Sequence, residues 1–418
     1  MMSPFIVILS TGSELTAGRS LDTNSGWIAN QLFELGWKVK KFITLPDDPN
    51  LILSELQSLQ TLAKEKPVLV IMTGGLGPTE DDYTLETVLK LTGKTSYSVE
   101  KAKLRLTKIY ESRGKEYKDI LPNVFRQTFV PEGCKTLDNS VGIAVGFVEV
   151  IGENSYLVCM PGVPSEMTEM FKRRLVPELK KLYPRENLLQ KTKWLWNIGE
   201  SLFQNDFIEP NRDEFFKEAE WGVTANRGYI KCIFQSTNQN LLDQIINRLE
   251  TQYPNIISDD VFSFVHERLL GENLTISVVE SCTGGLLGKK LTEQPGSSAY
   301  FMGGFLTYSN EMKSQLLGIP SETINSFGAV SEEVAKAMVD GLCLKTGTDF
   351  GISITGIAGP DGGSEGKPVG TVCIGIKEPN GETTVFRYVF PGNREAIREN
   401  ASNTAIFLIY QSLKKRVI

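Results

Sequence analysis

Short apolar runs alternate with amphipathic stretches over the first third of the chain. The runs at residues 4–9, 37–43 and 68–72 predict strands, and the third is apolar at every position, which is typical of a parallel sheet covered on both faces. Between them, apolar residues at helical spacing predict two helices, one beginning near Asp22 or Asn24 and one near Pro46. This alternation predicts a doubly wound α/β domain over residues 1–175.

A glycine-rich loop follows the third predicted strand. Ligands of such folds bind beyond the carboxyl ends of strands, and closely spaced glycines let the backbone approach an anion. Asp81 and Asp82 could hold a divalent cation that bridges phosphates. The alternative is a plain glycine turn before an acidic first helical turn, which needs no ligand. A second strand–turn–helix at residues 156–167 favours the ligand site. The candidate phosphate-binding residues are Thr73, Gly74, Gly75 and Gly77.

Residues 176–262 have a different pattern. Residues 193–200 and 228–235 read as short strands, and residues 241–249 as an amphipathic helix, so a small α+β linking domain is predicted. A nucleic-acid-binding KH module needs a basic Gly-x-x-Gly loop, which this segment lacks. We interpret it as a spacer and assembly domain.

The third domain, residues 263–418, opens with an apolar, β-branched run that ends in Ser281-Cys-Thr-Gly-Gly285 and resumes at helical spacing. A strand that passes into a helix through such a turn brings hydroxyls and free amides to a helix N-terminus, which suits an oxyanion or a phosphate. Ser281 is therefore a candidate nucleophile. The alternative is that Ser281 or Thr283 only caps the helix.

A second strand–helix junction, residues 305–313, carries Tyr308 and Lys313, with Ser309 or Asn310 beginning the helix. The two side chains are close enough in sequence to converge on one site, although a lysine on such a helix is more often solvated. A buried strand at residues 350–354 leads into the loop Thr355–Gly363, a candidate phosphate cradle. Arg394 and Arg398 share one face of a long C-terminal helix, where they could bind a phosphate or pair with Glu395 or Glu399.

The amino-acid composition and net charge exclude several classes of function. The chain has 418 residues, 41% hydrophobic and 22% charged, which predicts two or three globular domains. Its net charge of −6 provides no overall positive potential that would attract nucleic acid. The sequence contains no run of about 18 apolar residues, so no membrane span is predicted. The six cysteines form no C-x-x-C pair, which favours a reducing cytoplasm over zinc or disulfides. The sequence has one histidine, His266, so we expect catalysis to depend on hydroxyls, lysines and carboxylates.

The motifs of the first domain resemble those of CinA-type proteins, whose N-terminal domain is similar to the molybdopterin-binding fold of MoaB and MogA. The resemblance implies hydrolysis of ADP-ribose at its pyrophosphate, with a divalent metal held by Asp81, Asp82 and Glu166. The family's Asn-Pro-x-Gly-Thr-Ala-Pro-Gly appears here as residues 139–146, Asn-Ser-Val-Gly-Ile-Ala-Val-Gly, so a threonine and two prolines of this loop are missing. The linking segment resembles the KH-like domain of full-length CinA proteins.

The third domain resembles the CinA C-terminal domain, a nicotinamide mononucleotide deamidase also called PncC. The resemblance rests on residues 280–285, 308–313, 328–333 and 355–360, in family order and spacing. It implies that Ser281 is the nucleophile, that Tyr308 and Lys313 handle protons, and that no cofactor is needed. Amides of the 282–284 turn would bind the oxyanion, and Cys282 is a rival nucleophile without an evident base. The candidate substrate-binding residues are Cys282, Thr283, Gly284, Gly285, Asn310, Thr355, Gly356 and Gly359.

Three functions follow as hypotheses. The first is hydrolysis of nicotinamide mononucleotide to nicotinate mononucleotide and ammonia. The second is metal-dependent cleavage of ADP-ribose in the N-terminal domain, alone or beside the first. The third is a pterin-binding or competence-associated protein without catalysis. In each case we expect a cytoplasmic homodimer that binds small nucleotides and neither nucleic acid nor membranes.

Overall fold

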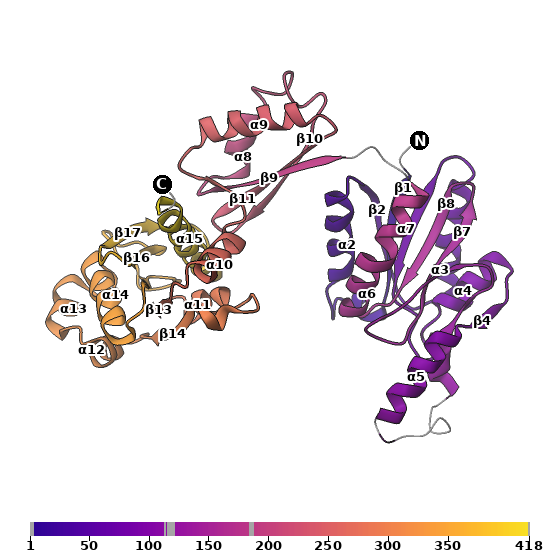
Figure 1. Cartoon of the computed structure of the whole chain (residues 1–418), viewed down its shortest axis with the longest axis horizontal. Helices are drawn as coiled ribbons and strands as arrows, with labels where there is room; N and C mark the ends of the chain where they lie inside the picture. The colour runs from indigo at the N-terminus through magenta and orange to yellow at the C-terminus, as the bar shows by residue number, and fades with distance from the viewer. Residues whose placement is uncertain (1–3, 113, 115–121, 184–187, 417–418) are drawn as a thin grey trace. The chain divides into compact units, whose positions relative to one another are not determined.

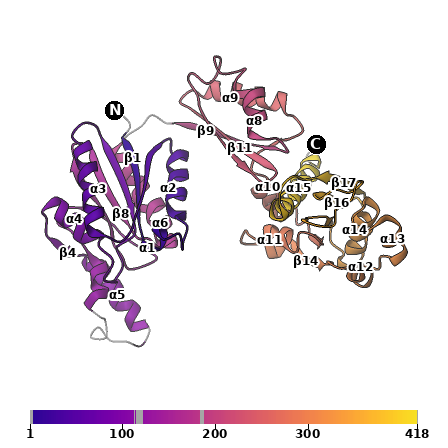
Figure 2. The same ribbon diagram turned by 180° about the vertical axis from the view of Figure 1, so that it is seen from behind.

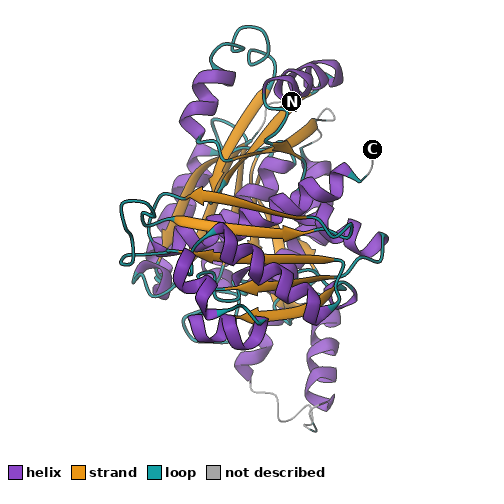
Figure 3. Cartoon of the chain, turned by 90° about the vertical axis from the view of Figure 1, so that its left-hand side faces the viewer, coloured by secondary structure: helices purple, strands orange, loops and turns teal. Residues whose placement is uncertain are grey.

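The chain forms two compact units, residues 1–188 and 189–418. The structure is a computed structural model, and it describes residues 4–112, 114, 122–183 and 188–416. Figures 1 and 2 show one sheet with flanking helices in the first unit and two sheets with their helices in the second, and Figure 3 distinguishes helices, strands and loops by colour. The α/β class predicted from the sequence is therefore confirmed. No helix in the described ranges is long and apolar enough to cross a membrane.

The first unit is built on a mixed sheet in the order β2-β1-β3-β8-β7-β6. The first four of these strands run parallel to one another, and β7 and β6 add an antiparallel edge. The parallel part matches the predicted doubly wound core, and the antiparallel edge was not predicted. The strands are β1 Phe5–Thr11, β2 Val39–Leu45, β3 Val68–Thr73, β6 Lys135–Leu137, β7 Gly146–Gly152 and β8 Ser155–Met160.

Alternate side chains of β1 enter two separate hydrophobic cores, because successive residues of a strand point to opposite faces of the sheet. Ile6 and Ile8 pack on one face, and Val7 and Leu9 pack on the other. One face is covered by α2, α6 and α7, and the other by α3 and α4 (Figure 1). The helices are α2 Thr23–Glu34, α3 Pro49–Leu62, α4 Thr84–Thr92, α5 Glu100–Ser112, α6 Pro164–Met170 and α7 Val176–Leu182.

The second unit contains a four-stranded sheet, β10-β11-β9-β12, backed by α9, and a five-stranded sheet, β14-β13-β15-β16-β17. The predicted strands and the helix of the linking segment are present, and β10 and β12 were not predicted. These elements are β9 Leu189–Trp196, α8 Glu200–Phe203, β10 Glu220–Asn226, β11 Tyr229–Ser236, α9 Gln239–Gln252 and β12 Ile257–Ser258.

The interpretation of the linking segment as a spacer needs correction. Trp194 and Trp196 of β9 belong to the same buried cluster as Phe407 and Ile409 of the C-terminal helix α15, Arg394–Lys415. The Trp196 ring stacks on Phe407 with centroids 4.5 Å apart. The segment therefore contributes two large aromatic side chains to the core of the C-terminal domain.

The five-stranded sheet has helices on both faces, as Figure 1 shows. On β13, Val278 packs with α10, α11 and α15, and Val279 packs with α12, α13 and α14. A tight turn with Gly381 at positive φ joins β16 to β17 as an antiparallel pair. The strands are β13 Ile276–Glu280, β14 Phe301–Leu306, β15 Phe350–Gly356, β16 Thr371–Lys377 and β17 Thr383–Val389. The helices are α10 Val261–Gly271, α11 Leu286–Leu291, α12 Asn310–Leu317, α13 Ser321–Phe327 and α14 Glu332–Thr346.

Candidate active site

The structure places Ser281 and Lys313 in contact. Ser281 follows directly after β13, and its amide donates to the Ile354 carbonyl of β15, so the neighbouring strand fixes its backbone. Lys313 lies on the first turn of α12, which begins where Ser309 caps the helix by accepting a hydrogen bond from the Met312 amide. The Lys313 ammonium donates to Ser281 Oγ at 3.2 Å and to the Thr307 carbonyl at 2.8 Å.

Lys313 is only 1% exposed, so the alternative of a solvated lysine is wrong. Burial lowers the pKa of its amine, because the charged form loses water and, among the described residues, no carboxylate faces it. A lysine with a lowered pKa can be neutral near neutral pH and can then accept a proton from the serine hydroxyl. Ser281 and Lys313 together therefore have the geometry of a nucleophile and its base.

Cys282, the rival nucleophile, faces the sheet. Burial raises the pKa of its thiol to about 12, so the thiol stays protonated. Its sulfur packs so closely against β15 that a Cβ added at Gly356 would lie 3.0 Å away from it. Only the thiolate is an effective nucleophile. The Cys282 side chain is therefore a packing group, and Gly356 provides the space for it.

No hydroxyl of the 281–285 turn caps the helix that follows it. The N-cap position of α11 is Gly285, with no side-chain cap, so the alternative that Ser281 or Thr283 caps the helix is wrong. Instead the carboxylate of Glu280 accepts hydrogen bonds from three amides at the start of α11, those of Gly285, Leu287 and Gly288.

The same turn decides which amides could bind an oxyanion. The Gly284 amide donates to the Ser281 carbonyl at 3.2 Å, and the Gly285 amide is engaged by Glu280. Both amides have acceptors within the protein, so the expectation that Gly284 donates to an oxyanion needs correction. In the part of the chain that the structure describes, the amides of Cys282 and Thr283 have no such acceptor and remain as candidate donors.

In the structure the Tyr308 hydroxyl does not contact Ser281 or Lys313. Tyr308 is 63% exposed, and its hydroxyl accepts a 2.7 Å hydrogen bond from Arg394 at the start of α15. The other terminal nitrogen of Arg394 donates to the Gly359 carbonyl at 2.8 Å. Tyr308, Gly359 and Arg394 thus form one connected group.

The remaining predicted residues lie at the edges of this region. Thr355 is buried and donates from its hydroxyl to the Ala329 carbonyl at 2.8 Å, so it joins the end of β15 to the loop before α14. Asn310 is the first residue of α12 and is exposed, with Ser309 taking the capping role. No described contact joins Asn310 to Ser281, and its substrate-binding role stays a prediction.

The two arginines of α15 do not pair with the acidic residues beside them. Arg398 donates to the Thr283 carbonyl at 2.7 Å, and Glu399 pairs with Lys290 at 2.9 Å. Arg394 and Arg398 line a hollow of about 580 Å³ together with Leu286 of α11, Asn393, Glu395 and Glu399. Arg398 therefore reaches the Ser281 turn itself. The alternative of surface ion pairs does not describe their contacts, and the arginines are better candidates for binding an anion.

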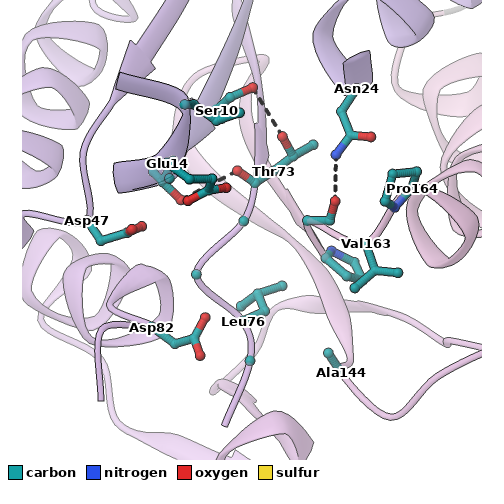
Figure 4. Close-up of a pocket in the computed structure, with 18 of the residues that line it drawn as sticks. Ser10, Glu14, Asn24, Asp47, Thr73, Leu76, Asp82, Ala144, Val163 and Pro164 are labelled. Carbon is teal, nitrogen blue, oxygen red and sulfur yellow. Dashed lines mark hydrogen bonds between the residues drawn. The ribbon is translucent and has the colours of Figure 1, made fainter. Parts of the chain in front are cut away.

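A second candidate site lies in the first unit, at the carboxyl ends of β1, β3 and β8. Its cavity of about 510 Å³ includes every residue predicted for this domain, namely Thr73, Gly74, Gly75, Gly77, Asp81, Asp82 and Glu166. Figure 4 shows the pocket and two of the hydrogen bonds that shape it, from Asn24 Nδ2 to the Gly162 carbonyl and between the Ser10 and Thr73 hydroxyls. The sequence did not single out Ser10, Glu14, Asn24 or Asp47 as site residues, although they line it too.

The acidic residues of this pocket are partly engaged. Asp82 accepts hydrogen bonds from the amide and hydroxyl of Thr79, and Glu166 accepts one from Asn139 Nδ2 at 2.6 Å. Asn139 Oδ1 also accepts from the amides of Val141 and Gly142, so it shapes the loop that lacks the expected prolines. Within the described ranges no group of three histidine, cysteine or acidic residues is arranged to hold a metal. The divalent metal stays a prediction.

Comparison with known proteins agrees with this architecture. A family model described as the CinA C-terminal domain matches residues 259–413, and one described as a probable molybdopterin binding domain matches residues 7–181. A CinA-like protein of Leptospira biflexa is 84% identical over 417 residues and covers 100% of both chains. The chain belongs to the CinA family. A CinA-like protein of Chlorobium limicola is 38% identical, covering 96% of this chain and 95% of its own length.

Solved structures of CinA proteins match part of the chain. The competence/damage inducible protein CihA of Agrobacterium tumefaciens is 37% identical, covers 38% of this chain and 97% of its own, and has a TM-score of 0.36. In this CinA family chain, the sequence motifs indicated both Ser281 and Lys313 as candidate catalytic residues. They did not reveal Glu280, although a carboxylate placed between a buried strand and a glycine turn could have suggested a helix-start acceptor.

Proposed function

We propose that the C-terminal domain hydrolyses the carboxamide of nicotinamide mononucleotide, releasing ammonia and nicotinate mononucleotide. The observation that carries the proposal is the buried contact between Lys313 Nζ and Ser281 Oγ, 3.2 Å apart. A serine paired with a neutral lysine is a base–nucleophile pair that needs neither histidine nor metal. The CinA family model over residues 259–413 and the hollow beside Arg398 support a nucleotide as the substrate.

The reaction has two halves. Neutral Lys313 takes the proton of Ser281 Oγ as the oxygen attacks the carboxamide carbon, and the amides of Cys282 and Thr283 stabilise the oxyanion. When the C–N bond breaks, the Lys313 ammonium returns its proton to the departing nitrogen, which leaves as ammonia. Water, deprotonated by Lys313, then attacks the acyl-serine ester, which yields the carboxylate and restores the serine. Arg398 and Arg394 offer guanidinium groups to the substrate phosphate.

The test is ammonia release from nicotinamide mononucleotide by the full chain. Ser281→Ala should lower the rate by roughly a thousandfold or more, because the nucleophile is lost. Cys282→Ala should retain most of the activity. Ser298→Ala, at an exposed serine on the same domain, is the matched control. Wild-type protein that releases no ammonia, or Ser281→Ala protein that remains active, would overturn the proposal. We expect the active protein to be a cytoplasmic homodimer without a cofactor for this reaction.

The cavity of the first unit favours a second activity, metal-dependent cleavage of ADP-ribose. Its glycine loop offers backbone amides, and Asp81 and Asp82 offer adjacent carboxylates. Magnesium is commonly held by one or two carboxylates together with substrate phosphates and water, so this donor set fits such an ion without a third acidic ligand. AMP formed from ADP-ribose with a divalent metal, and abolished by a chelator and by Asp82→Asn, would support it. If no metal gives AMP, a binding role for the cavity, with a pterin as ligand, becomes the better hypothesis.

A further inference from the structure

Glu280 is the last residue of β13 and is 1% exposed. One carboxylate oxygen accepts from the Gly285 amide at 3.0 Å and the Leu287 amide at 3.2 Å, and the other accepts from the Gly288 amide at 2.8 Å. The Glu280 side chain therefore spans the whole turn that contains Ser281 and binds the start of α11 on its far side.

The main chain of Glu280 is fixed as well. Its carbonyl accepts from the Thr307 amide at 2.8 Å, beyond β14, and the following amide, that of Ser281, donates to Ile354 of β15 at 2.9 Å. The turn is thus anchored at its beginning by two neighbouring strands and at its end by one carboxylate. Between these anchors lie the nucleophile and the two candidate oxyanion amides.

The carboxylate also changes the electrostatics of the helix start. The first amides of a helix carry partial positive charge and suit a bound anion. Here the two carboxyl oxygens of Glu280 accept hydrogen bonds from three of those amides, and α11 has only six residues. A substrate phosphate therefore has little attraction to this helix start. The guanidinium groups of Arg394 and Arg398 line the neighbouring hollow instead.

We propose that Glu280 is a positioning residue: its buried carboxylate holds the 281–285 turn so that Ser281 Oγ faces Lys313 and the Cys282 and Thr283 amides stay available. The inference rests on the proposed acyl-transfer function of Ser281. Glu280 itself touches no reacting atom, and it acts only through the turn.

Glu280→Gln tests this with the same side-chain length. The amide keeps one acceptor oxygen but turns an NH₂ group toward backbone donors and removes the charge. We expect kcat to fall about 10- to 100-fold, as for other outer groups that orient reacting residues, while KM changes less than about threefold. Glu280→Asp, which keeps both carboxylate oxygens, should recover part of kcat. Glu293→Gln, at an exposed residue just after α11 ends, is the control.

Labelling of Ser281 by a fluorophosphonate, followed by mass spectrometry, separates this inference from the proposed function. Wild-type labelling without ammonia release, combined with slower labelling of Glu280→Gln, would overturn the deamidase and keep the positioning role. Unchanged kcat and unchanged labelling in Glu280→Gln would overturn the positioning role alone. Absence of both labelling and turnover in the wild type would overturn both. If Glu280→Gln and Glu280→Asp both fail to fold by circular dichroism, Glu280 is a stability residue and the inference is rejected.

Discussion

Lys313 Nζ lies 3.2 Å from Ser281 Oγ, although the two residues are 32 positions apart in the sequence. The contact depends on parallel pairing of β13 with β14, which brings the ends of both strands to one edge of the sheet. Ser281 follows β13, and α12 begins shortly after β14. The lysine reaches the serine from the first turn of that helix and is buried by the surrounding loops.

The pH profile should follow Lys313. Burial lowers the pKa of its amine, and only the neutral amine can accept the serine proton. We therefore expect kcat/KM to rise with pH through that lowered pKa and to level off above it. Lys313→Arg should be inactive at every pH, since a guanidinium stays charged. Lys289→Arg, at an exposed lysine, should keep the wild-type profile. A profile that is flat from acid to alkaline pH would contradict the assigned base.

The same burial predicts a gain in stability when the lysine is removed. A lysine with a lowered pKa in the folded state binds fewer protons than in the unfolded chain, so wild-type stability rises with pH toward the unfolded pKa of about 10.4. Lys313→Met should therefore raise the free energy of unfolding by about 1 kcal/mol at neutral pH, a common gain when an active-site charge is replaced. This difference in the free energy of unfolding between the variant and wild type should shrink at alkaline pH. Urea denaturation of both proteins at two pH values measures the difference, and a difference that grows with pH would refute the explanation.

Tyr308 should act through Arg394. Its hydroxyl accepts a 2.7 Å hydrogen bond from that arginine, 86 positions away, and the tyrosine ring is largely exposed. In a double-mutant cycle we expect Tyr308→Phe and Arg394→Lys to be coupled by about 1 kcal/mol in kcat/KM, because they remove the same contact. Independent effects, with the two losses simply multiplying, would instead support Tyr308 as a separate proton-transfer group.

Arg398 offers a test for recognition of the phosphate. We expect Arg398→Ala to raise KM for nicotinamide mononucleotide by roughly tenfold or more, since hydrogen bonds to charged groups contribute about 1.5–3 kcal/mol. The riboside, which lacks the phosphate, should be affected far less. Arg398 also donates to the Thr283 carbonyl at 2.7 Å. Equal losses with both substrates would therefore show that Arg398 holds the turn and does not bind the phosphate.

The sequence was sufficient to predict features encoded in short stretches. The apolar run of β3 and the strand–turn–helix at Ser281 were visible, because strand and helix periodicity and turn residues are local signals. The Tyr308–Arg394 contact was not visible, because contacts between segments 86 positions apart leave no periodic signal in a single sequence. The three amides bound by Glu280 lie within eight residues of it, so the carboxylate before a glycine turn was a local signal that the prediction did not use.

The linking segment is the clearest case of a packing relationship hidden from the sequence, and it can be tested by stability. Trp196 is fully buried, stacks on Phe407 of α15 and donates from Nε1 to the Ser258 hydroxyl at 2.8 Å. Because the aromatic ring fills a shared core, Trp196→Ala should lower the free energy of unfolding by about 3–5 kcal/mol. Leu202→Ala, at a side chain 53% exposed on the same segment, is the control.

Since α15 also carries Arg394 and Arg398, the Trp196→Ala variant should lose ammonia release at a lower temperature than wild type. The buried cluster around Trp196 joins the linking segment to the C-terminal domain. We therefore expect residues 189–418 to unfold in a single transition in urea, followed by tryptophan fluorescence and by activity together. If Trp196→Ala lowers the unfolding free energy by less than about 1 kcal/mol, the ring lies outside the core. If activity persists after the linking segment has unfolded, the deamidase domain is stable without it.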